Sequence, residues 1–532
     1  MKLIIRSMLL GALVLSVYRT ESSAFGIPRA TPTPTPTASP EIRASPTPAQ
    51  IQTLESLQSK IRGRVLSPEA VRSRVGIKIV SLATGKVVFE NDADKYYMPA
   101  SNMKNFTVAA ALDTLGPDFK FVTSVYAAAP PDASGTLKGD LRIFGRGDVS
   151  FSTLFSTGNY YKGLDDLADK IVAAGVKRVE SQLIADENYF SGNAIPVTWE
   201  WDDLQWSDGA EVSAFPINNN AVDLSVKGGT SEFEPCAVDI LPTNTVFQII
   251  NTCTTVAGTK RTLSVKKALD TNKVLISGKM PARETFTGYL AVTHPAELFI
   301  SMLKERLQKK GVVILGAAST RPTSTMPTAS TLELARLESP PLGVIAAKTM
   351  KPSQNMFTEV ILWTLGEAGS PAPDYGPLGQ SRVDPRPDSA VLGVRRVKDF
   401  MAKAGIPPDA VVQWDGSGLS RHDLVTPSAV VQLYSYMAKS RNAQVWRDSL
   451  AVGGVDGTLR NRFKGTAADG NFRGKTGTLD QVSALSGYVT TAAGEELIVS
   501  IIVNTLPEPP KRVALIDSIV LQLANFNGKV DQ

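Results

Sequence analysis

The sequence contains very few residues of the two types on which most metal and thiol chemistry depends. Its 532 residues include two histidines, His294 and His422, and two cysteines, Cys236 and Cys253. Two histidines cannot form a multi-histidine metal site, and two cysteines cannot form a four-cysteine zinc site. We therefore expect no metal and no cofactor. A hydrolytic mechanism would have to use carboxylates, or a serine whose base need not be histidine.

Dense clusters of basic residues are also lacking, although the net charge is +5. Lys and Arg occur together only in short pairs such as Lys266 and Lys267. Because a nucleic-acid-binding surface typically shows a basic stripe, nucleic acid is not an expected partner. The apolar fraction of 43% and the charged fraction of 20% are typical of a globular protein. The length is sufficient for two or three domains.

Long apolar runs are missing except at the N-terminus. Lys2 and Arg6 precede a short apolar run over residues 7–18, and small residues follow at 22–24. This pattern predicts a secretory signal peptide over residues 1–24. An uncleaved anchor is the alternative, but the run is shorter than the roughly 20 residues that a membrane span needs. We therefore expect an exported protein, either periplasmic or secreted.

Export would place both cysteines in an oxidising compartment, where disulfides persist. A disulfide between Cys236 and Cys253 is the expected arrangement, and two buried free thiols are the alternative. The Pro/Thr-rich stretch at residues 31–48 cannot build a core and favours an extended chain. We interpret residues 25–50 as a tether between the cleavage site and the folded body.

Hydrophobic patterns predict one domain made from both ends of the chain, residues 51–120 and 339–532. Strand-like alternation and helical spacing occur near each end. The predicted strands are residues 75–81, 87–90, 484–490 and 497–503, and the predicted helices are residues 51–66, 105–115 and 512–526. A sheet built from both chain ends, with helices on its faces, explains these patterns. Residues 121–338 contain short strand-like runs and one clear helix at 296–308, which predicts a β-rich insertion.

The first chemical motif is Ser101-Asn102-Met103-Lys104, next to a predicted helix. Residues three apart lie on one face of a helix, so the Lys104 amine would lie beside the Ser101 hydroxyl. A serine becomes a good nucleophile when a neighbouring base takes its proton. A lysine serves as that base if burial or nearby positive charge lowers its pKa. Alone, the pattern would equally describe a surface Ser and Lys.

The second motif is Ser353-Gln354-Asn355, followed by a long apolar run. Ser353 could relay a proton between Lys104 and a leaving amine, and Asn355 could donate its amide hydrogens to a substrate carbonyl. Alone, the pattern would also fit a helix N-cap.

The third motif is Lys475-Thr476-Gly477-Thr478, just before the C-terminal strands. Its position predicts an edge strand beside the serine. Lys475 and the hydroxyls of Thr476 and Thr478 would bind a carboxylate, and Gly477 would let a substrate backbone approach. Alone, the motif would also fit a polar turn.

The three motifs occur in the order found in penicillin-binding proteins and class A β-lactamases. About 250 residues separate the first two motifs, far more than in a β-lactamase. Three further stretches, at residues 145–148 (GRGD), 210–220 (AEVSAFPINNN) and 415–422 (DGSGLSRH), complete the pattern. The chain after the tether resembles the D-alanyl-D-alanine carboxypeptidase/endopeptidase family of low-molecular-mass, class C penicillin-binding proteins.

The resemblance implies an α/β (α+β) transpeptidase-like domain, in which an antiparallel sheet is flanked by helices. A large β-rich insertion would separate the first two motifs and consist of two subdomains, one nested in the other. The implied partners are peptidoglycan peptides and β-lactams.

The resemblance also implies roles for the motif residues. Ser101 would be acylated, Lys104 would be the general base, and Ser353, Asn355 and Lys475 would complete the site. The backbone N–H groups of Ser101 and Thr478 would form the oxyanion hole, which is often the largest catalytic contribution.

An acidic residue in the segment 199–204 is implied to hold the amine of the peptide side chain. Asp203 matches best, although the adjacent Asp202 and a simple solvated acid are alternatives. The family also has an arginine after the second motif, and residues 381–396 hold too many arginines to select one. We expect His422 and His294 to be structural, since Lys104 already supplies the base.

Two other functions fit parts of the pattern. A β-lactamase or esterase on the same fold would differ in how fast water reaches the acyl-enzyme, and no obvious deacylating Glu motif is visible. A silent wall-binding protein would not need three intact motifs. Turnover of a D-Ala-D-Ala peptide and turnover of a β-lactam would separate these functions.

Overall fold

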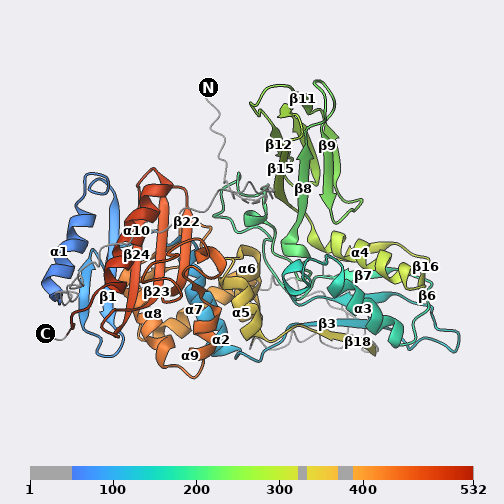
Figure 1. Cartoon of the computed structure of the whole chain (residues 1–532). Helices are drawn as coiled ribbons and strands as arrows, with labels where there is room; N and C mark the ends of the chain where they lie inside the picture. The colour runs from blue at the N-terminus through green and yellow to red at the C-terminus, as the bar shows by residue number, and fades with distance from the viewer. Residues whose placement is uncertain (1–50, 322–331, 369–386, 531–532) are drawn as a thin grey trace, which may run out of the picture. The chain divides into compact units, whose positions relative to one another are not determined.

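A six-stranded antiparallel sheet joins the two ends of the chain, as the strand patterns predict (Figure 1). The computed structural model describes residues 51–321, 332–368 and 387–530. The strand order is β2-β1-β24-β23-β22-β21. These strands are β1 (Arg74–Ser81), β2 (Val87–Asn91), β21 (Ala451–Val452), β22 (Arg473–Leu479), β23 (Val482–Thr490) and β24 (Glu496–Asn504). Pairing of β1 with β24 along its whole length closes the domain from both termini.

Helices cover both faces of this sheet because its strands are apolar on both sides. Along β24, Val499 and Ile501 belong to a core shared with α1 (Leu54–Val65) and α10 (Pro509–Ala524). Ile498 and Ile502 belong to a second core, on the other helical layer. That layer contains α2 (Lys104–Thr114), α5 (Leu342–Met350), α6 (Asn355–Glu367), α7 (Ser389–Lys403), α8 (Pro427–Lys439) and α9 (Ala443–Ser449). The predicted sheet with helices on its faces is confirmed.

Two of these helices, α2 and α6, are buried on nearly all sides. Every residue of α2 from position 104 to 112 is buried, and so is every residue of α6 from 356 to 366. A helix that is apolar around its whole circumference must lie inside the core. The two helices contact each other, and each begins at a chemical motif. The packing therefore fixes the first two motifs relative to each other.

The first part of the insertion combines a sheet with two helices. A five-stranded sheet has the order β17-β7-β5-β3-β18, and a small sheet has the order β16-β6-β4. The strands are β3 (Val122–Ala127), β4 (Thr136–Leu137), β5 (Leu141–Phe144), β6 (Arg178–Val179), β7 (Leu183–Asp186), β16 (Val313–Ile314), β17 (Ala318–Arg321) and β18 (Leu332–Glu338). The helix predicted at 296–308 is α4 (Pro295–Lys309).

The prediction of one clear helix in the insertion is wrong, because α3 (Lys162–Ala173) is a second one. Its buried residues, Leu164, Leu167, Ala168 and Ile171, follow helical spacing. The helix packs on α4 in the core of the insertion. The polar residues between these positions form the exposed face of an amphipathic helix.

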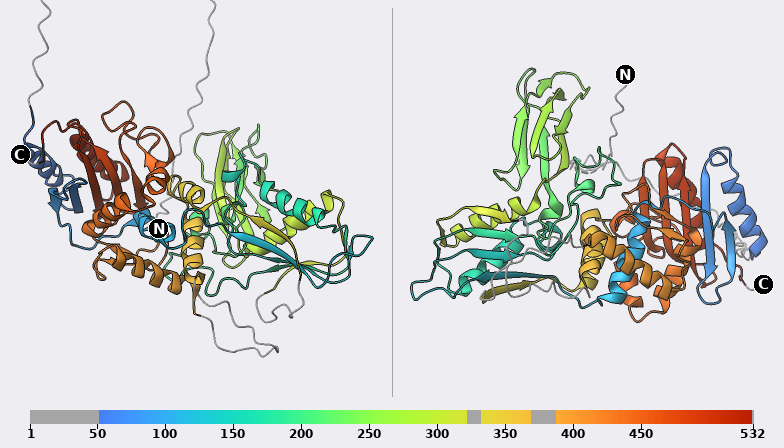
Figure 2. Two further views of the ribbon diagram at one scale, coloured as in Figure 1. Left: turned by 90° about the horizontal axis from the view of Figure 1, so that it is seen from below. Right: turned by 180° about the vertical axis from the view of Figure 1, so that it is seen from behind.

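The second part of the insertion consists of strands only, and both views of Figure 2 show its strands gathered together in green. Its sheets have the orders β15-β8-β9, β10-β13-β12 and β11-β14. The strands are β8 (Ala221–Lys227), β9 (Ala237–Leu241), β10 (Gln248–Asn251), β11 (Thr254–Val256), β12 (Ser264–Lys267), β13 (Lys273–Ser277), β14 (Lys279–Pro281) and β15 (Thr285–Ala291). The expected disulfide joins Cys236 to Cys253 within this part, with a Cα–Cα distance of 5.4 Å.

The predictions about the N-terminal segment and about the domain limits stay predictions. The signal peptide and the tether lie in residues 1–50, outside the described residues. The limits at residues 120 and 339, and the nesting of the insertion, are interpretations. Within the described ranges, no helix combines the length and the apolar character needed to cross a membrane.

Candidate active site

Ser101 and Lys104 lie on one tight turn that leads into the buried helix α2. Ser101 is in a 3-10 turn, η1 (Ala100–Met103), and Lys104 is the first residue of α2. Ala100 has a φ of 47°, so the backbone enters this turn in the left-handed region. Such strain is held only where the surroundings enforce it. Lys104 Nζ lies 2.9 Å from Ser101 Oγ, which places the two groups together as the spacing predicts.

The Lys104 amine has three oxygen neighbours and no exposed surface. Besides Ser101 Oγ, Nζ lies 2.6 Å from Asn355 Oδ1 and 2.8 Å from the carbonyl oxygen of Ser417. Burial lowers the pKa of Lys104 to about 8, and nearby carboxylates, chiefly Asp415, oppose this shift. A neutral amine has two N–H bonds and one lone pair. Two of the three neighbours can only accept, so the lone pair is directed at the Ser101 hydroxyl.

The second motif reaches the same lysine from α6. Asn355 is the first residue of α6, and its amide Nδ2 donates to the backbone oxygen of Asp208 at 3.0 Å. Asn355 therefore connects Lys104 to the segment that carries Asp203. Ser353 precedes the helix with a φ of 66°, in the left-handed region.

Lys475 lies on β22, is fully buried, and meets the second motif. Its Nζ donates to Ser353 Oγ at 2.8 Å and to the backbone oxygen of Thr476 at 2.8 Å. Burial, followed by the positive charge of Lys104, lowers the pKa of Lys475 well below its ordinary value. Within the described residues, the Ser353 hydroxyl has no hydrogen bond to Lys104. The structure thus brings all three motifs together, with Ser353 on the Lys475 side.

The rest of the third motif follows β22 past the turn that holds the serine. A Cβ on Gly477 would lie 2.6 Å from the carbonyl oxygen of Pro99, so glycine is required for this close approach. Thr476 Oγ1 is hydrogen-bonded to Thr458 Oγ1 at 2.7 Å, and Thr478 is exposed. β21 pairs with β22 only at residues 473 and 474. The strand from Lys475 onward therefore has an open edge among the described strands, in agreement with the prediction.

The segment at residues 415–422 packs against the turn that carries Ser101 and supplies the Ser417 carbonyl that contacts Lys104. The sequence did not indicate this role. Gly418 has a φ of 79°, and a side chain there would overlap the carbonyl oxygen of Ala100. Asp415 accepts hydrogen bonds from Gly418 N at 2.6 Å and from Ser420 N at 2.7 Å. A buried carboxylate therefore fixes the turn that carries the Ser417 carbonyl.

Asp203 lies on a half-buried loop that is anchored to the catalytic domain. Trp199 Nε1 donates to Asp415 Oδ2 at 2.8 Å at one end of this loop. The pKa of Asp203 is raised to about 6, first by burial and then by the nearby acids Asp202, Glu200 and Asp208. No hydrogen bond to the Asp203 carboxylate occurs within the described ranges. The nearby Arg421 opposes the rise in the pKa of Asp203.

The insertion holds the same loop through Gln205. Its Nε2 donates to the Val265 carbonyl at 3.0 Å, and its Oε1 accepts from Lys267 N at 3.0 Å. Both partners belong to β12. The all-β part of the insertion therefore positions the loop that carries Asp203.

The prediction that an arginine from residues 381–396 belongs to the site stays a prediction. Positions up to 386 lie outside the described residues, and Arg396 donates to the Ala368 carbonyl at 3.4 Å. Arg421 was missed by the sequence analysis. It donates to Glu200 at 3.0 Å and to the Asp480 carbonyl at 3.2 Å, which ties the Asp203 loop to the turn after β22.

The two histidines have contacts outside the motif cluster. The His422 ring packs against Trp414 at a centroid distance of 5.6 Å. His294 lies before α4, and its backbone N–H donates to Glu211 Oε2 at 2.8 Å. Both sets of contacts fit structural roles.

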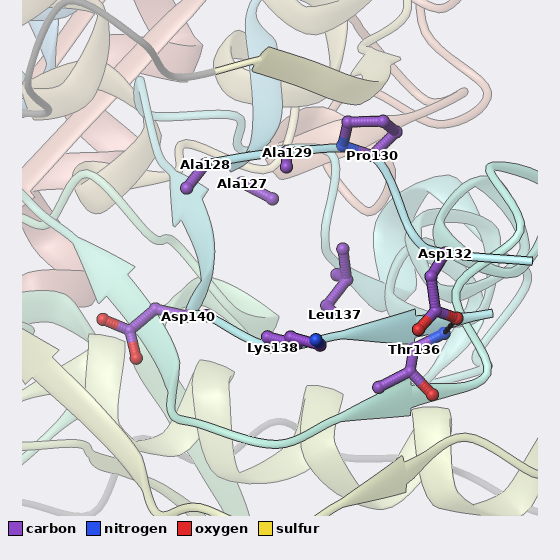
Figure 3. Close-up of a pocket in the computed structure, with 10 residues that line it drawn as sticks. Ala127, Ala128, Ala129, Pro130, Asp132, Thr136, Leu137, Lys138 and Asp140 are labelled. Carbon is purple, nitrogen blue, oxygen red and sulfur yellow. Dashed lines mark hydrogen bonds between the residues drawn. The ribbon is translucent and has the colours of Figure 1, made fainter. Parts of the chain in front are cut away.

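A hollow elsewhere in the insertion is separate from this site. Figure 3 shows its lining, which comes from residues 127–140 around β4 and encloses about 230 Å³. None of the residues that line it belongs to the three motifs. The hollow is therefore not part of the candidate active site formed by the motif cluster.

Ser101 and Lys104 of the first motif, Asn355 of the second and Lys475 of the third lie in one cluster, and this set of motifs is the one found in penicillin-binding serine enzymes. The model of the D-Ala-D-Ala carboxypeptidase 3 (S13) family matches residues 57–525, so the chain belongs to this family. This result confirms the resemblance seen in the sequence.

Relatives and solved structures agree with this assignment. The chain is 32% identical to the D-alanyl-D-alanine carboxypeptidase of Actinomadura sp., covering 87% of this chain and 84% of the relative. It is 24% identical to D-alanyl-D-alanine carboxypeptidase DacB of Haemophilus influenzae, covering 80% and 84%. The crystal structure of penicillin binding protein 4 from H. influenzae matches with a TM-score of 0.74 at 23% identity. That match covers 90% of this chain and 100% of the other, and it confirms the fold class.

Proposed function

We propose that this protein is a serine-type D-Ala-D-Ala carboxypeptidase and DD-endopeptidase that acts on peptidoglycan peptides through an acyl-enzyme on Ser101. One observation supports the proposal most strongly. Lys104 Nζ lies within hydrogen-bond distance of Ser101 Oγ, Asn355 Oδ1 and the Ser417 carbonyl. Because the last two can only accept, the neutral form of the amine would direct its lone pair at the Ser101 hydroxyl. The lowered pKa of Lys104, about 8, makes the neutral form accessible near physiological pH.

The proposed reaction has two covalent steps. Lys104 Nζ takes the proton from Ser101 Oγ while Oγ bonds to the carbonyl carbon of the penultimate D-alanine. The peptide C–N bond then breaks, and Lys104 returns the proton to the leaving amine. Ser353 is the proposed relay for this transfer, and it would have to turn from Lys475, which holds its hydroxyl in this structure. Water hydrolyses the resulting ester and restores Ser101. The backbone N–H groups of Ser101 and Thr478 stabilise the oxyanion in both steps.

The remaining motif residues bind the substrate. The Lys475 ammonium and the hydroxyls of Thr476 and Thr478 hold the terminal carboxylate, and an anion bound there restores the charged form of the buried lysine. Gly477 lets the peptide backbone lie along the open edge of β22. Asp203 binds the amine of the peptide side chain, because a cation relieves the repulsion from its acidic neighbours.

The relatives support this substrate class and a location outside the cytoplasm. The Actinomadura relative is a D-alanyl-D-alanine carboxypeptidase, and the H. influenzae penicillin binding protein 4 has been crystallised with a novel β-lactam. β-Lactams are therefore proposed inhibitors that acylate Ser101. The Cys236–Cys253 disulfide supports export to the periplasm or the medium, because disulfides persist in oxidising compartments.

Turnover of a tripeptide ending in Lys-D-Ala-D-Ala tests the proposal. The wild type should release D-alanine, Ser101→Ala should release none, and Ser435→Ala should match the wild type. Ser435 is a matched control because its hydroxyl bonds only within α8, to the Val431 carbonyl. Rapid hydrolysis of benzylpenicillin without peptide turnover would instead indicate a β-lactamase. Peptide turnover by Ser101→Ala would refute the assignment of the nucleophile.

A further inference from the structure

Three buried carboxylates lie behind the active site, and the proposed reaction uses none of them. Glu359 is on α6, and Asp415 and Asp423 are on the segment that follows β19 (Val411–Val412). Each is at most 1% exposed. A buried carboxylate is costly unless hydrogen bonds or charges compensate it. Their contacts therefore call for a functional explanation.

Glu359 binds the backbone of one peptide segment. Its Oε1 accepts from Gly416 N at 3.0 Å and from Ser417 N at 2.7 Å, and its Oε2 accepts from Gly416 N at 2.9 Å. All three contacts are backbone N–H donors, which an ionised carboxylate accepts, while burial and then the neighbouring Asp415 raise the pKa of Glu359 to about 8. From the opposite side, Thr107 of α2 donates to the Gly416 carbonyl at 2.9 Å. The peptide is thus held between α6 and α2.

The carbonyl of this segment is one of the two acceptors that orient Lys104. Ser417 O accepts from Lys104 Nζ at 2.8 Å, and Asn355 Oδ1 accepts at 2.6 Å. Asn355 and Glu359 are four residues apart, so they lie on the same face of α6. One helix therefore sets both acceptors, one directly and the other through the backbone at residues 416–417.

The other two acids, Asp415 and Asp423, accept hydrogen bonds from the backbone of the same segment and lie near Lys104. Asp415 accepts from Gly418 N, Ser420 N and Trp199 Nε1, and Asp423 accepts from Trp414 N at 2.6 Å. The titratable groups that face Lys104 are Glu359, Asp415, Asp423, Asp208 and Lys475. Burial and then Asp415 raise the pKa of Asp423 well above its ordinary value.

We propose that Glu359 is a positioning residue for the general base: it fixes the Gly416–Ser417 peptide so that the Ser417 carbonyl and Asn355 together direct the Lys104 lone pair at Ser101. This inference rests on the proposed role of Lys104. It assigns a function to a buried acid that touches neither Ser101 nor the expected substrate position.

The chemistry of the contacts predicts what the loss of Glu359 would do. A glutamine offers one acceptor oxygen, and its amide NH₂ would oppose the backbone N–H groups. The peptide would shift, and the amine would lose one of the two acceptors that orient it. Loss of the hydrogen bond to the Ser417 carbonyl disfavours the charged amine and lowers the pKa of Lys104. Loss of the Glu359 charge acts in the same direction in the fraction of protein in which Glu359 is ionised.

The test is the pH profile of acylation by benzylpenicillin in Glu359→Gln, measured as the limiting rate from pH 6 to 10. We expect the plateau rate to fall about tenfold to a hundredfold, as for other displaced catalytic groups. The midpoint of the rise should move to lower pH by about one unit. If Glu359 served only in folding, a smaller fraction of the variant would react with benzylpenicillin. The folded fraction would then keep the wild-type pH midpoint. The labelled fraction after long incubation corrects for this.

Two further variants make the result decisive. Glu367→Gln is the matched control, since Glu367 lies on the same helix and accepts from Ser389 Oγ, and it should keep the wild-type profile. Gly416→Ala leaves Glu359 intact but would place a Cβ 3.3 Å from its Oε2 and 3.0 Å from the Thr358 carbonyl. Gly416→Ala should lower the plateau rate of acylation and the pH midpoint of its rise, as Glu359→Gln should. It takes the place of Glu359→Gln if that variant does not fold.

The outcomes separate this inference from the proposed function. A wild-type plateau rate and midpoint in Glu359→Gln, or in Gly416→Ala if the first variant does not fold, would overturn the positioning role. A wild-type profile with no rise in this pH range, or an unchanged profile in Lys104→Met, would instead overturn the assignment of Lys104 as base.

Discussion

The pH dependence of acylation follows directly from the burial of Lys104. Burial disfavours the ammonium and lowers its pKa from 10.5 to about 8, so the free amine forms at lower pH than in an exposed lysine. With that pKa, about 1% of the protein carries the free amine at pH 6 and about half carries it at pH 8. If Lys104 is the base, acylation at pH 6 should be about fiftyfold slower than at pH 8.

The assay is stopped-flow acylation by a chromogenic penicillin at saturating concentration, so that carboxylate binding by Lys475 does not set the rate. The rate should rise about tenfold per pH unit below pH 7 and gain only about twofold above pH 8. Lys104→Met should lose acylation, whereas Lys403→Met should keep the full profile, because Lys403 is an exposed lysine paired with Asp113. A flat rate from pH 6 to 9 would refute the reasoning. So would a tenfold rise per unit that continues through pH 10, since that is the behaviour of an unshifted lysine.

Three other predictions concern the backbone at Gly418, the Cys236–Cys253 disulfide and the carboxylate of Asp203. Gly418→Ala should lose at least about 2 kcal/mol of stability and most acylation, because left-handed strain adds to steric overlap. Thermal melts measure this loss. Gly494→Ala is the control, because Gly494 has a φ of 85° with open space around it, and it should lose only about 1 kcal/mol. Replacing Cys236 and Cys253 by serine opens a 17-residue loop and should cost about 3 kcal/mol in denaturant unfolding, and an unchanged midpoint would contradict this. Asp203→Asn should raise KM for a peptide with an amine side chain but not for its acetylated form, and equal effects on both would argue against this contact.

Much of the fold could be predicted because the patterns in the two terminal regions are strong. The alternating residues of β1, the continuous apolar run of β24 and the helical spacing in α10 give the sheet and one of its covering layers. The order of the three motifs then predicts that distant segments converge. The helix α3 was missed although its buried residues Leu164, Leu167, Ala168 and Ile171 follow helical spacing, because the surrounding sequence is dominated by short strand-like runs.

The support behind the site could not be predicted in the same way. Lys104, Asn355 and Lys475 belong to recognisable motifs, and the structure brings them together. Glu359 acts on residues more than 50 positions away through backbone N–H groups, which have no sequence signature. The four-residue spacing from Asn355 was the only available signal, and such spacing is common in helices. The hydrogen bonds of Gln205 with β12 also join residues about 60 positions apart and have no sequence signature.

Intact-mass spectrometry with benzylpenicillin tests the central claim most directly, namely that Ser101 is the acylated nucleophile. The wild type should gain the mass of one penicillin, and Ser101→Ala should gain none under the same conditions. Unlabelled wild-type protein in the presence of intact drug, or a Ser101→Ala variant that still gains one penicillin, would contradict the account.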